Sequence, residues 1–408
     1  MPDSVIVPGH KIRFTYKGVE LSGIIISTEE ALANIKMSNG YNITIPKDEI
    51  SVIESEEMHQ SPAIAPAVKN KDAVVDIIAT GGTIASRVDY RTGAVTPVTD
   101  SSLIGGNIPN LSKFPHNIFA LKPMLSENMT PEVWAKIARK ANDSMKEGRS
   151  VIILHGTDTM AYTASALSFM FQGLRKPLIM VGSQRSSDRP STDAFPNLEG
   201  ALEFSSRDIG EVGISMHQNL SDNRISLVRG VRARKMHSSR RDAFHPMGEP
   251  PMAIFEKNEV RIDPSVRSTR DDYQFNPALE SSVSLIYFHP MLSEDDFLNI
   301  CEGKKAVVIA GTGLGHVGSR LFRSIGKLRR EGVHFGMVTQ CLNGKVDMNV
   351  YSTGRELLRA GVIPLSNMLP EVALVKFSHV LANYDTEKVD QMMVTNLRGE
   401  IIEREGIM

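Results

Sequence analysis

The feature that most constrains this chain is the alternation of short β-rich runs with helical segments beyond residue 72. The β-rich runs cover residues 74–79, 151–154, 177–181 and 212–216. Such alternation is typical of a parallel sheet covered by helices. One helix is sharply marked, because Thr130 supplies an N-cap, Pro131 the first helical position and Gly148 a stop. The sequence therefore predicts an α/β fold.

The first 53 residues follow a different pattern. Ile12, Phe14 and Tyr16 alternate with polar residues, and Asn39-Gly40 between two further alternating runs is a type I′ hairpin signal. The next 19 residues carry charge and two prolines without a clear period, as linkers do. A chain of 408 residues predicts roughly two to three folding units. We predict a small β-barrel domain over 1–53, a linker over 54–72 and two α/β domains over 73–275 and 282–408.

Composition excludes several classes of function. Lys and Arg number 46 against 47 Asp and Glu, so bulk charge supplies no attraction toward nucleic acid or anionic lipid. No apolar run approaches the roughly 18 residues needed to span a bilayer, and nothing at the N-terminus resembles a secretory leader. Only Cys301 and Cys341 could form a disulfide. We expect a cytoplasmic protein that makes no membrane contact.

Two polar loops follow predicted strands. The first, TGGTIAS, places Gly82 and Thr83 at the carboxyl end of a strand, where ligands bind open α/β sheets. The second, HGTDTM, crowds Thr157 and Asp158 at another strand end, just before a helix for which Thr159 is the expected N-cap. An ordinary turn would explain the glycines alone, but it does not explain both loops.

A threonine hydroxyl needs a neighbouring base before it can act as a nucleophile at neutral pH. Lys235 is the candidate, because nearby positive charges favour a neutral amine and a carboxylate such as Asp158 would hold it in place. The surrounding arginines are Arg224, Arg229, Arg232, Arg234, Arg240 and Arg241. They indicate either a face of salt bridges, the usual outcome, or an anion or RNA patch.

Two other patterns carry less weight. Residues 313–318 match G-x-G-x-x-G, but the acidic residue expected about 20 positions further on is missing from 334–343, which argues against a dinucleotide. The 11 histidines show no metal-ligand spacing. We therefore predict no metal and no cofactor in this chain.

TGGTIAS and HGTDTM together resemble the two signature sequences of the L-asparaginase family, and this resemblance runs from about residue 74 onward. It implies the family's two-domain α/β architecture. The N-terminal β unit, which we expect to be SH3-like, is absent from free-standing asparaginases. Together with MLSENMTP at 124–131 and SQRSSDRPSTDAFPNL at 183–198, it is similar to archaeal amidotransferases that act on charged tRNA.

The resemblance also implies roles for particular residues. Thr83 would be the attacking hydroxyl with Tyr90 as its helper, ranked ahead of the second cluster, Thr157, Asp158 and Lys235. Ser126 and Glu127 would hold the α-carboxylate and α-ammonium of the substrate, and backbone N–H groups of the loops at Gly82 and Gly156 would stabilise the oxyanion. Asn128 stands where free asparaginases commonly carry Asp, which leaves the choice between glutamine and asparagine open.

The implied reaction is release of ammonia from a side-chain amide through a threonine ester. The ammonia would pass to a tRNA-binding partner subunit, which uses ATP and Mg to convert Glu-tRNA(Gln) to Gln-tRNA(Gln). The resemblance implies a homodimeric core with two copies of this partner, an α2β2 heterotetramer that contacts tRNA(Gln) mainly through the partner. The alternatives are a free-standing cytosolic asparaginase with an added β domain, and a catalytically inactive assembly scaffold.

Overall fold

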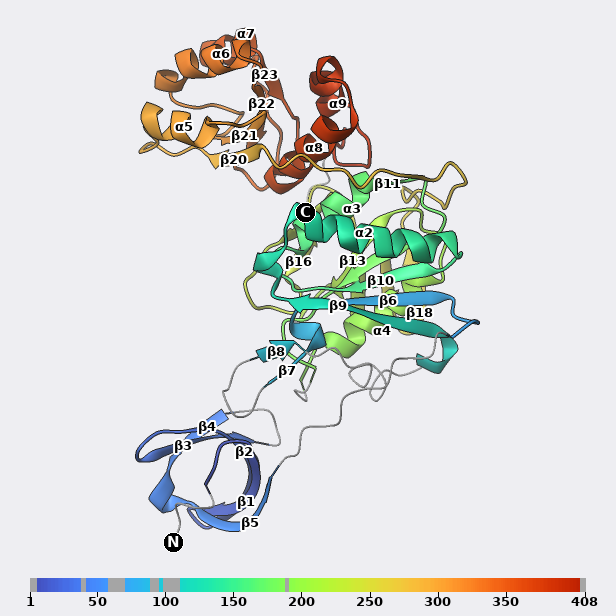
Figure 1. Cartoon of the computed structure of the whole chain (residues 1–408), viewed down its shortest axis with the longest axis vertical. Helices are drawn as coiled ribbons and strands as arrows, with labels where there is room; N and C mark the ends of the chain where they lie inside the picture. The colour runs from blue at the N-terminus through green and yellow to red at the C-terminus, as the bar shows by residue number, and fades with distance from the viewer. Residues whose placement is uncertain are drawn as a thin grey trace.

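The computed structural model of the chain describes residues 6–37, 42–57, 70–88, 95–97, 111–187 and 191–403. A small all-β part, a large α/β part and a second α/β part follow one another along the longest axis (Figure 1). The Asn39-Gly40 turn, residues 58–69 of the expected linker and Tyr90 lie outside the described residues. No described helix is long and apolar enough to cross a membrane.

The N-terminal part is a five-stranded antiparallel sheet in the order β4-β3-β2-β1-β5, and it curls around its own core (Figure 1). Its core contains the alternating residues Ile12 and Phe14, which are 1% and 0% exposed. Residues 54–57, which the sequence assigned to the linker, instead extend the last strand and pair with the first. The strands are β1 (His10–Tyr16), β2 (Val19–Thr28), β3 (Leu32–Met37), β4 (Asn42–Pro46) and β5 (Ser51–Glu57).

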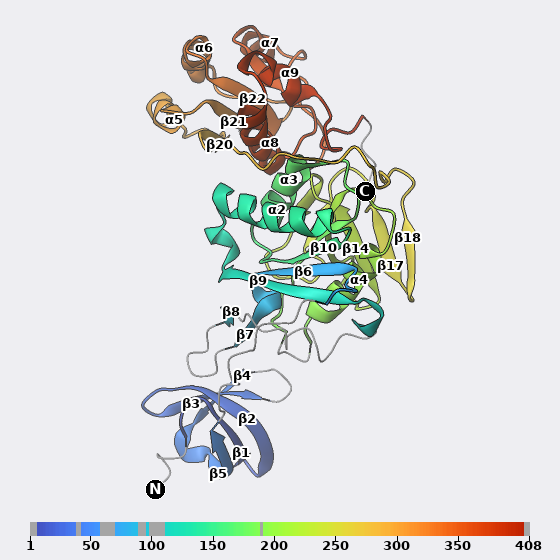
Figure 2. The same cartoon turned by 45° about the vertical axis from the view of Figure 1, so that its right-hand side comes forward.

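The second part is built on an eight-stranded sheet in the order β18-β17-β14-β13-β12-β10-β6-β9. Its strands are β6 (Val75–Gly81), β9 (His116–Met124), β10 (Ser150–Leu154), β12 (Leu178–Val181), β13 (Val212–His217), β14 (Arg224–Arg229), β17 (Ala253–Glu256) and β18 (Glu259–Ile262). The first five of these are mutually parallel. The sequence predicted a parallel sheet from four of them, all but β9. The remaining three, at one side of the sheet in Figure 2, run antiparallel. The six residues between β13 and β14 are too few for a parallel crossover.

Helices cover both faces of this sheet. On one face, α2 (Pro131–Lys146) and α3 (Met160–Met170) pack on Ile78, Ile153 and Met180. On the other face, α4 (Ala194–Ser205) packs on the alternate residues of the same strands (Figure 1). The predicted start of α2 is confirmed, since the hydroxyl of Thr130 accepts from the N–H of Val133 at 3.4 Å.

The C-terminal part is a four-stranded parallel sheet formed by β20 (Val283–Tyr287), β21 (Ala306–Gly311), β22 (His334–Thr339) and β23 (Val362–Pro364). One face is covered by α5 (Glu294–Cys301), α6 (Phe322–Arg330) and α7 (Ser352–Arg359), and the other by α8 (Pro370–Asn383) and α9 (Val389–Val394). The packing of α8 on α3 joins both α/β parts in one hydrophobic core, where the rings of Phe169 and His379 stack with centroids 6.0 Å apart. Cys301 and Cys341 are both free thiols.

Short two-stranded pairings complete the fold around the large sheet. They are β7 (Ser86–Val88) with β8 (Val95–Pro97), β11 (Phe171–Gln172) with β19 (Gln274–Phe275), and β15 (Ala233–Lys235) with β16 (Phe244–Pro246). The last of these pairings positions Lys235. The described 3-10 turns are η1 (Lys47–Glu49), η2 (Thr83–Ala85), η3 (Leu111–Lys113), η4 (Ser126–Asn128), η5 (Ser319–Leu321) and η6 (Thr386–Lys388).

Candidate active site

The two polar loops meet because the strands before them, β6 and β10, are neighbouring parallel strands. Their carboxyl ends therefore lie at the same edge of the sheet. At that edge the backbones of Gly82 and Gly156 touch, since a Cβ added to Gly82 would lie 2.3 Å from the Gly156 nitrogen. A Cβ on Gly156 would in turn lie 2.8 Å from the Cβ of Ser126. Glycine is therefore required at both positions for the loops at Gly82, Gly156 and Ser126 to approach one another this closely.

The predicted base lies within hydrogen-bond distance of the second loop. Lys235 Nζ is 2.8 Å from Thr157 Oγ1 and 2.7 Å from Asp158 Oδ1. The Lys235 side chain is only 14% exposed, whereas that of Asp158 is 70% exposed. Thr157 is buried, and its methyl group packs against Gly182 at the end of β12. The structure thus joins a hydroxyl, an amine and a carboxylate from positions 77 and 78 residues apart in the sequence.

Thr83 is half-buried and begins the η2 turn directly after Gly82. Within the described residues its hydroxyl makes no hydrogen bond. Gly82, the residue before Thr83, contacts Gly156, the residue before Thr157. The two threonine loops are therefore in contact through their glycines.

Ser126 and Glu127 begin the η4 turn, which follows β9. The side chain of Ser126 is buried against Gly156, and that of Glu127 is exposed. The carbonyl of Ser126 accepts a 2.6 Å hydrogen bond from the hydroxyl of Thr159. This contact corrects one prediction: Thr159 occupies the N-cap position of α3, but its side chain makes no capping bond. The Thr159 hydroxyl instead holds the turn that carries Ser126 and Glu127.

His155 supports the second loop from beneath. Its Nδ1 lies 2.6 Å from the carbonyl oxygen of Gly156, and its Nε2 lies 3.0 Å from the hydroxyl of Thr163, which accepts from the indole N–H of Trp134 at 2.9 Å. Complete burial lowers the pKa of His155 to about 4. The ring is therefore neutral at pH 7 and positions the loop without serving as a charged group.

The segment that carries Lys235 is held by the C-terminal part of the chain. Arg232, 1% exposed, donates to the carbonyl oxygens of Met247 at 2.8 and 2.5 Å, Asn367 at 2.8 Å and Glu400 at 3.2 Å. Arg234 Nε lies 3.8 Å from Glu371 Oε1 on α8. Burial raises the pKa of Glu371, and the charge of Arg234 opposes that rise. Sequence reasoning missed this support, because most of the acceptors are backbone carbonyls.

The six arginines around Lys235 form salt bridges and backbone contacts. The described carboxylate partners are Glu256 for Arg224, Glu211 and Glu249 for Arg229, Glu371 for Arg234, Asp242 for Arg240 and Asp222 for Arg241. Arg232 is the exception, because it binds the carbonyls named above. These contacts favour the salt-bridge interpretation of the basic segment over an RNA patch.

The structure also locates the two weaker patterns. Residues 313–318 form a tight turn after β21, where Gly315 packs against Val346. In the part of the chain that the structure describes, no group of three or more His, Cys, Asp and Glu side chains could hold a metal ion.

Comparison with known proteins decides the family. The family model "Asparaginase, N-terminal" matches residues 74–267, and "Glutaminase/Asparaginase C-terminal domain" matches residues 282–393. The D-type subunit of the glutamyl-tRNA(Gln) amidotransferase of Thermoplasma acidophilum is 47% identical over 396 residues, which cover 96% of each chain. This chain belongs to the family of D-type glutamyl-tRNA(Gln) amidotransferase subunits, within the asparaginases. The D-type protein of Saccharolobus islandicus is 42% identical over 413 residues, covering 97% of this chain and 93% of that protein.

Solved structures confirm the asparaginase fold of this D-type family member. The thermostable L-asparaginase from Thermococcus kodakarensis aligns with a TM-score of 0.74 and 30% identity, covering 80% of this chain and 99% of that one. L-asparaginase I from Vibrio cholerae gives 0.71 and 32%, with coverage of 81% and 99%. These asparaginases leave about a fifth of the chain unmatched, whereas the D-type amidotransferase relatives match nearly all of it.

Proposed function

We propose that this chain is the ammonia-supplying amidohydrolase subunit of a tRNA-dependent amidotransferase, acting in the cytoplasm on the side-chain amide of glutamine or asparagine. The contact that carries the proposal is the one between Lys235 Nζ and the Thr157 hydroxyl at 2.8 Å. It brings an amine against a hydroxyl beside the close contact of Gly82 with Gly156, which supports Lys235 as the base. Family membership supports the reaction class.

In the proposed reaction, the Thr83 oxygen attacks the amide carbon and gives up its proton to a base. Tyr90 is the assigned helper at this step. The tetrahedral intermediate collapses, the C–N bond breaks, and the nitrogen takes a proton and leaves as ammonia. Water, activated by Thr157 with Lys235, then cleaves the ester and releases the acid. Asp158 holds the Lys235 amine at 2.7 Å and orients it toward Thr157.

We assign substrate binding to the η4 turn and to the backbone of the loops at Gly82 and Gly156. Ser126 and Glu127 are assigned to the α-carboxylate and α-ammonium groups, and the contact of Ser126 with Gly156 places them beside the catalytic loops. Backbone N–H groups of the loops at Gly82 and Gly156 would stabilise the oxyanion, an effect worth about 3 kcal/mol. No metal or cofactor is assigned to this chain.

The partner proposed for the chain is a tRNA-binding subunit of the E type, which binds ATP and Mg and consumes the ammonia. The net charge of -1 supports the assignment of tRNA binding to the partner, since a protein without basic bias is unsuited to holding tRNA(Gln) by itself.

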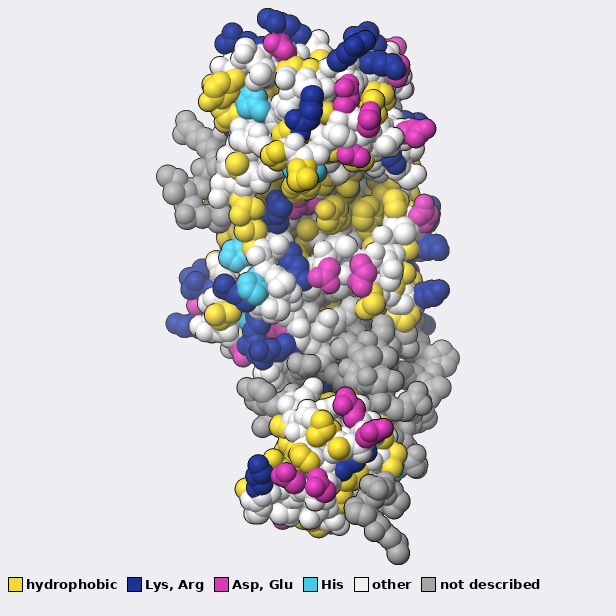
Figure 3. All heavy atoms as spheres, turned by 90° about the vertical axis from the view of Figure 1, so that its left-hand side faces the viewer, with side chains coloured by type: hydrophobic (Ala, Val, Ile, Leu, Met, Phe, Trp, Pro, Cys, Tyr) yellow, Lys and Arg dark blue, Asp and Glu magenta, His cyan; other side chains and the backbone are white. Residues whose placement is uncertain are grey.

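We further propose a homodimeric core within an α2β2 heterotetramer. Figure 3 shows hydrophobic side chains gathered in a hollow between the two α/β parts. Leu125 and Met236, each next to a site residue, are 48% and 38% exposed and would be covered by a second protomer.

Covalent labelling of the nucleophile tests which hydroxyl attacks. A glutamine analogue with an electrophilic diazoketone, 6-diazo-5-oxo-L-norleucine, alkylates the nucleophile of glutaminases. Peptide mass mapping of the labelled full chain should place the adduct on Thr83. The Thr83→Val variant should remain unlabelled, whereas Thr157→Val should be labelled slowly at Thr83. An adduct on Thr157 in the wild-type chain would reverse the assignment of the two threonines.

A free-standing asparaginase remains the second candidate, favoured by the 30 and 32% identity to L-asparaginases over four-fifths of the chain. The two candidates differ in their dependence on the partner. We expect the purified chain to hydrolyse glutamine slowly until the tRNA-binding subunit and charged tRNA are added. Full asparagine hydrolysis by the chain alone, unchanged by those additions, would favour the second candidate.

A further inference from the structure

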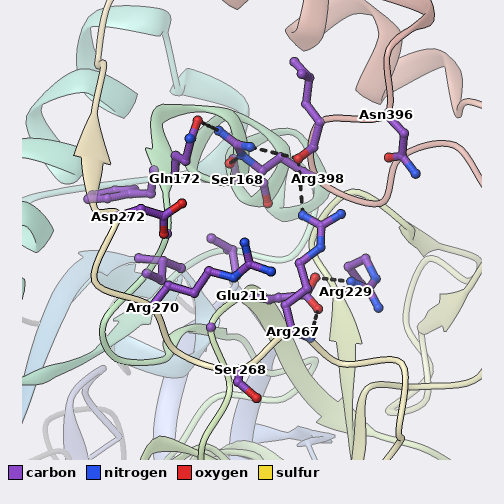
Figure 4. Close-up of a pocket in the computed structure, with 16 residues that line it drawn as sticks. Ser168, Gln172, Glu211, Arg229, Arg267, Ser268, Arg270, Asp272, Asn396 and Arg398 are labelled. Carbon is purple, nitrogen blue, oxygen red and sulfur yellow. Dashed lines mark hydrogen bonds and ion pairs between the residues drawn. The ribbon is translucent and has the colours of Figure 1, made fainter.

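A polar cavity of about 400 Å³ lies at the opposite edge of the large sheet from the candidate active site (Figure 4). Its walls come from the end of α3, the residues before β13, the connector between the two α/β parts, and the segment after α9. Leu174 and Glu211 precede β12 and β13, so the cavity lies at the amino ends of the strands, whereas Thr157 follows a carboxyl end. Helix α3 runs between the two places, about 16 Å at 1.5 Å per residue.

Six of the sixteen residues that line the cavity are charged. Arg229, Arg267, Arg270 and Arg398 border the cavity together with Glu211 and Asp272. Arg229 is already neutralised, because it pairs with Glu211 and, at 2.9 Å, with Glu249. The three carboxylates of Glu211, Glu249 and Asp272 balance three of the four guanidinium groups, which leaves one positive charge. The nearby Glu400 does not change this balance, since it pairs with Lys376 at 2.6 Å.

The surplus charge lies on three arginines with unused donors. Arg398 donates to the carbonyls of Ser168 and Leu397 at 2.8 Å, and Arg267 donates to the same Leu397 carbonyl at 3.2 Å. Two guanidinium groups thus share one acceptor. Burial lowers the pKa of Arg398, the negative charge of Glu400 opposes this shift, and the positive charge of Arg267 lowers the pKa further. An anion between these arginines would relieve that repulsion.

Arg270 and Asp272 complete the lining with opposite charges. Among the described residues, the Arg270 guanidinium has no hydrogen-bond or ion-pair partner, and Figure 4 shows it directed into the space that the pocket residues surround. Asp272 lies against Gly173, where an added Cβ would be 2.3 Å from its Oδ1, and it accepts no hydrogen bond from the described residues. The cavity therefore offers guanidinium donors together with one separate carboxylate.

We propose that this cavity is a second ligand site, for an amino acid with two carboxylates, and that L-glutamate is the one it takes. Glutamate carries two carboxylates, which suit Arg267, Arg270 and Arg398, and one ammonium, which suits Asp272. Its net charge of −1 matches the surplus positive charge of the lining. The cavity volume lies in the range of about 300 to 1,000 Å³ found for small-molecule sites. The choice of glutamate over aspartate rests on the proposed function with glutamine as the substrate, because glutamate is the product of glutamine hydrolysis. The existence of the site does not rest on the proposed function.

Equilibrium dialysis of the full chain against labelled L-glutamate tests the site. We expect Arg270→Ala to weaken glutamate binding at least about 10-fold, as loss of a charge-assisted contact does. Arg261→Ala, a change to an exposed arginine on β18, is the matched control and should leave binding unchanged. Because Arg270 lies at the opposite edge of the sheet from Lys235, this loss would not report on the amidase site. Equal binding by the wild type and Arg270→Ala would overturn the proposal.

A second variant tests the ammonium contact. Asp272→Asn should weaken binding of glutamate about 10-fold, yet leave unchanged or strengthen binding of glutarate, which has both carboxylates but no ammonium. A parallel loss of both ligands would contradict the role of Asp272. Inorganic phosphate is the third probe: saturable phosphate binding that depends on Arg270, with no glutamate binding, would show a simple oxyanion site and overturn the assignment. These dialysis measurements do not require an active enzyme, so they stand or fall separately from the proposed function.

Discussion

Lys235 Nζ lies 2.8 Å from Thr157 Oγ1, although the two residues are 78 positions apart and belong to different elements. Thr157 follows a strand of the central sheet, whereas Lys235 ends a short strand that is itself held by the C-terminal part of the chain. The candidate site therefore depends on contacts between both α/β parts as well as on its own loops.

Removing the amine should slow steady-state ammonia release, because the threonine ester would no longer be hydrolysed efficiently. We expect Lys235→Met to reduce glutamine hydrolysis by at least about 100-fold, because general-base catalysis contributes that much or more. A coupled assay of ammonia, run on the complex with its partner subunit, measures the effect. Lys146→Met, a change to an exposed lysine at the end of α2, is the control and should retain full activity. Wild-type chain that releases no ammonia in the complex would indicate the inactive scaffold instead.

Adding one methyl group at Gly82 should disrupt the closure of the two loops. Gly82→Ala places a Cβ 2.3 Å from the backbone of Gly156, at a φ of +80°. Gly148 has a nearly equal φ of +77° with nothing within 4 Å, so Gly148→Ala isolates the cost of the backbone conformation, about 1 to 2 kcal/mol. Urea unfolding and ammonia release should show a larger loss for Gly82→Ala, with activity lost only there. Equal stability losses with retained activity would mean that the loops can separate without consequence.

The buried guanidinium of Arg232 should matter for both stability and turnover. Arg232→Met keeps the side-chain volume but leaves the carbonyls of Met247, Asn367 and Glu400 without this donor. Since a buried unsatisfied group costs about 1 to 3 kcal/mol, we expect a loss of at least about 2 kcal/mol in unfolding free energy.

Activity should fall with Arg232→Met as well, because Lys235 lies three residues further on. The control is Arg261→Met, whose exposed ion pair with Glu256 should contribute less than about 1 kcal/mol. A chain that loses stability but keeps its full kcat at low temperature would show that Arg232 does not position Lys235.

Acid should destabilise the fold through His155. Its pKa is about 4 in the folded chain, below the roughly 6.5 of an unfolded histidine. The unfolded state therefore binds more protons as pH falls from 6.5 toward 4, and stability is lost across that window. Between pH 7.5 and 5 this one group should account for about 2 kcal/mol.

Urea unfolding of wild type and His155→Gln at both pH values measures this contribution. The variant should show a smaller decrease in unfolding free energy between pH 7.5 and 5. His379, whose burial also lowers its pKa to about 4, remains in both proteins and so cancels in the comparison. An identical decrease in the two proteins would assign the acid sensitivity to other groups.

Sequence reasoning named three candidate site residues that the structure brings together, and it missed the contacts that hold them. Thr157, Asp158 and Lys235 follow recognisable patterns, and the structure brings them together. Arg232 could not be singled out, since its acceptors are carbonyls 135 and 168 residues away and any residue type supplies a carbonyl.

The other errors came from local sequence patterns that are compatible with two different structures. Thr159 stands where a helix-capping hydroxyl is expected, but the carbonyl of Ser126 lies close enough to take its hydrogen bond. Likewise, the sequence predicted a parallel sheet, but the β-rich pattern of β13 does not encode the direction of its neighbours. The six-residue connection to β14, a strand that the sequence analysis did not predict, requires the antiparallel arrangement.

The carbonyl contacts of Arg232 also have a consequence for biosynthesis. Asn367 and Glu400 leave the ribosome 135 and 168 residues after Arg232, so the segment bearing Lys235 lacks these two anchors while translation is still under way and is held only by nearer contacts such as that of Arg232 with Met247. A nascent or prematurely terminated chain would hold both signature loops with a less firmly fixed Lys235. Full activity would therefore wait for synthesis of the C-terminal part of the chain.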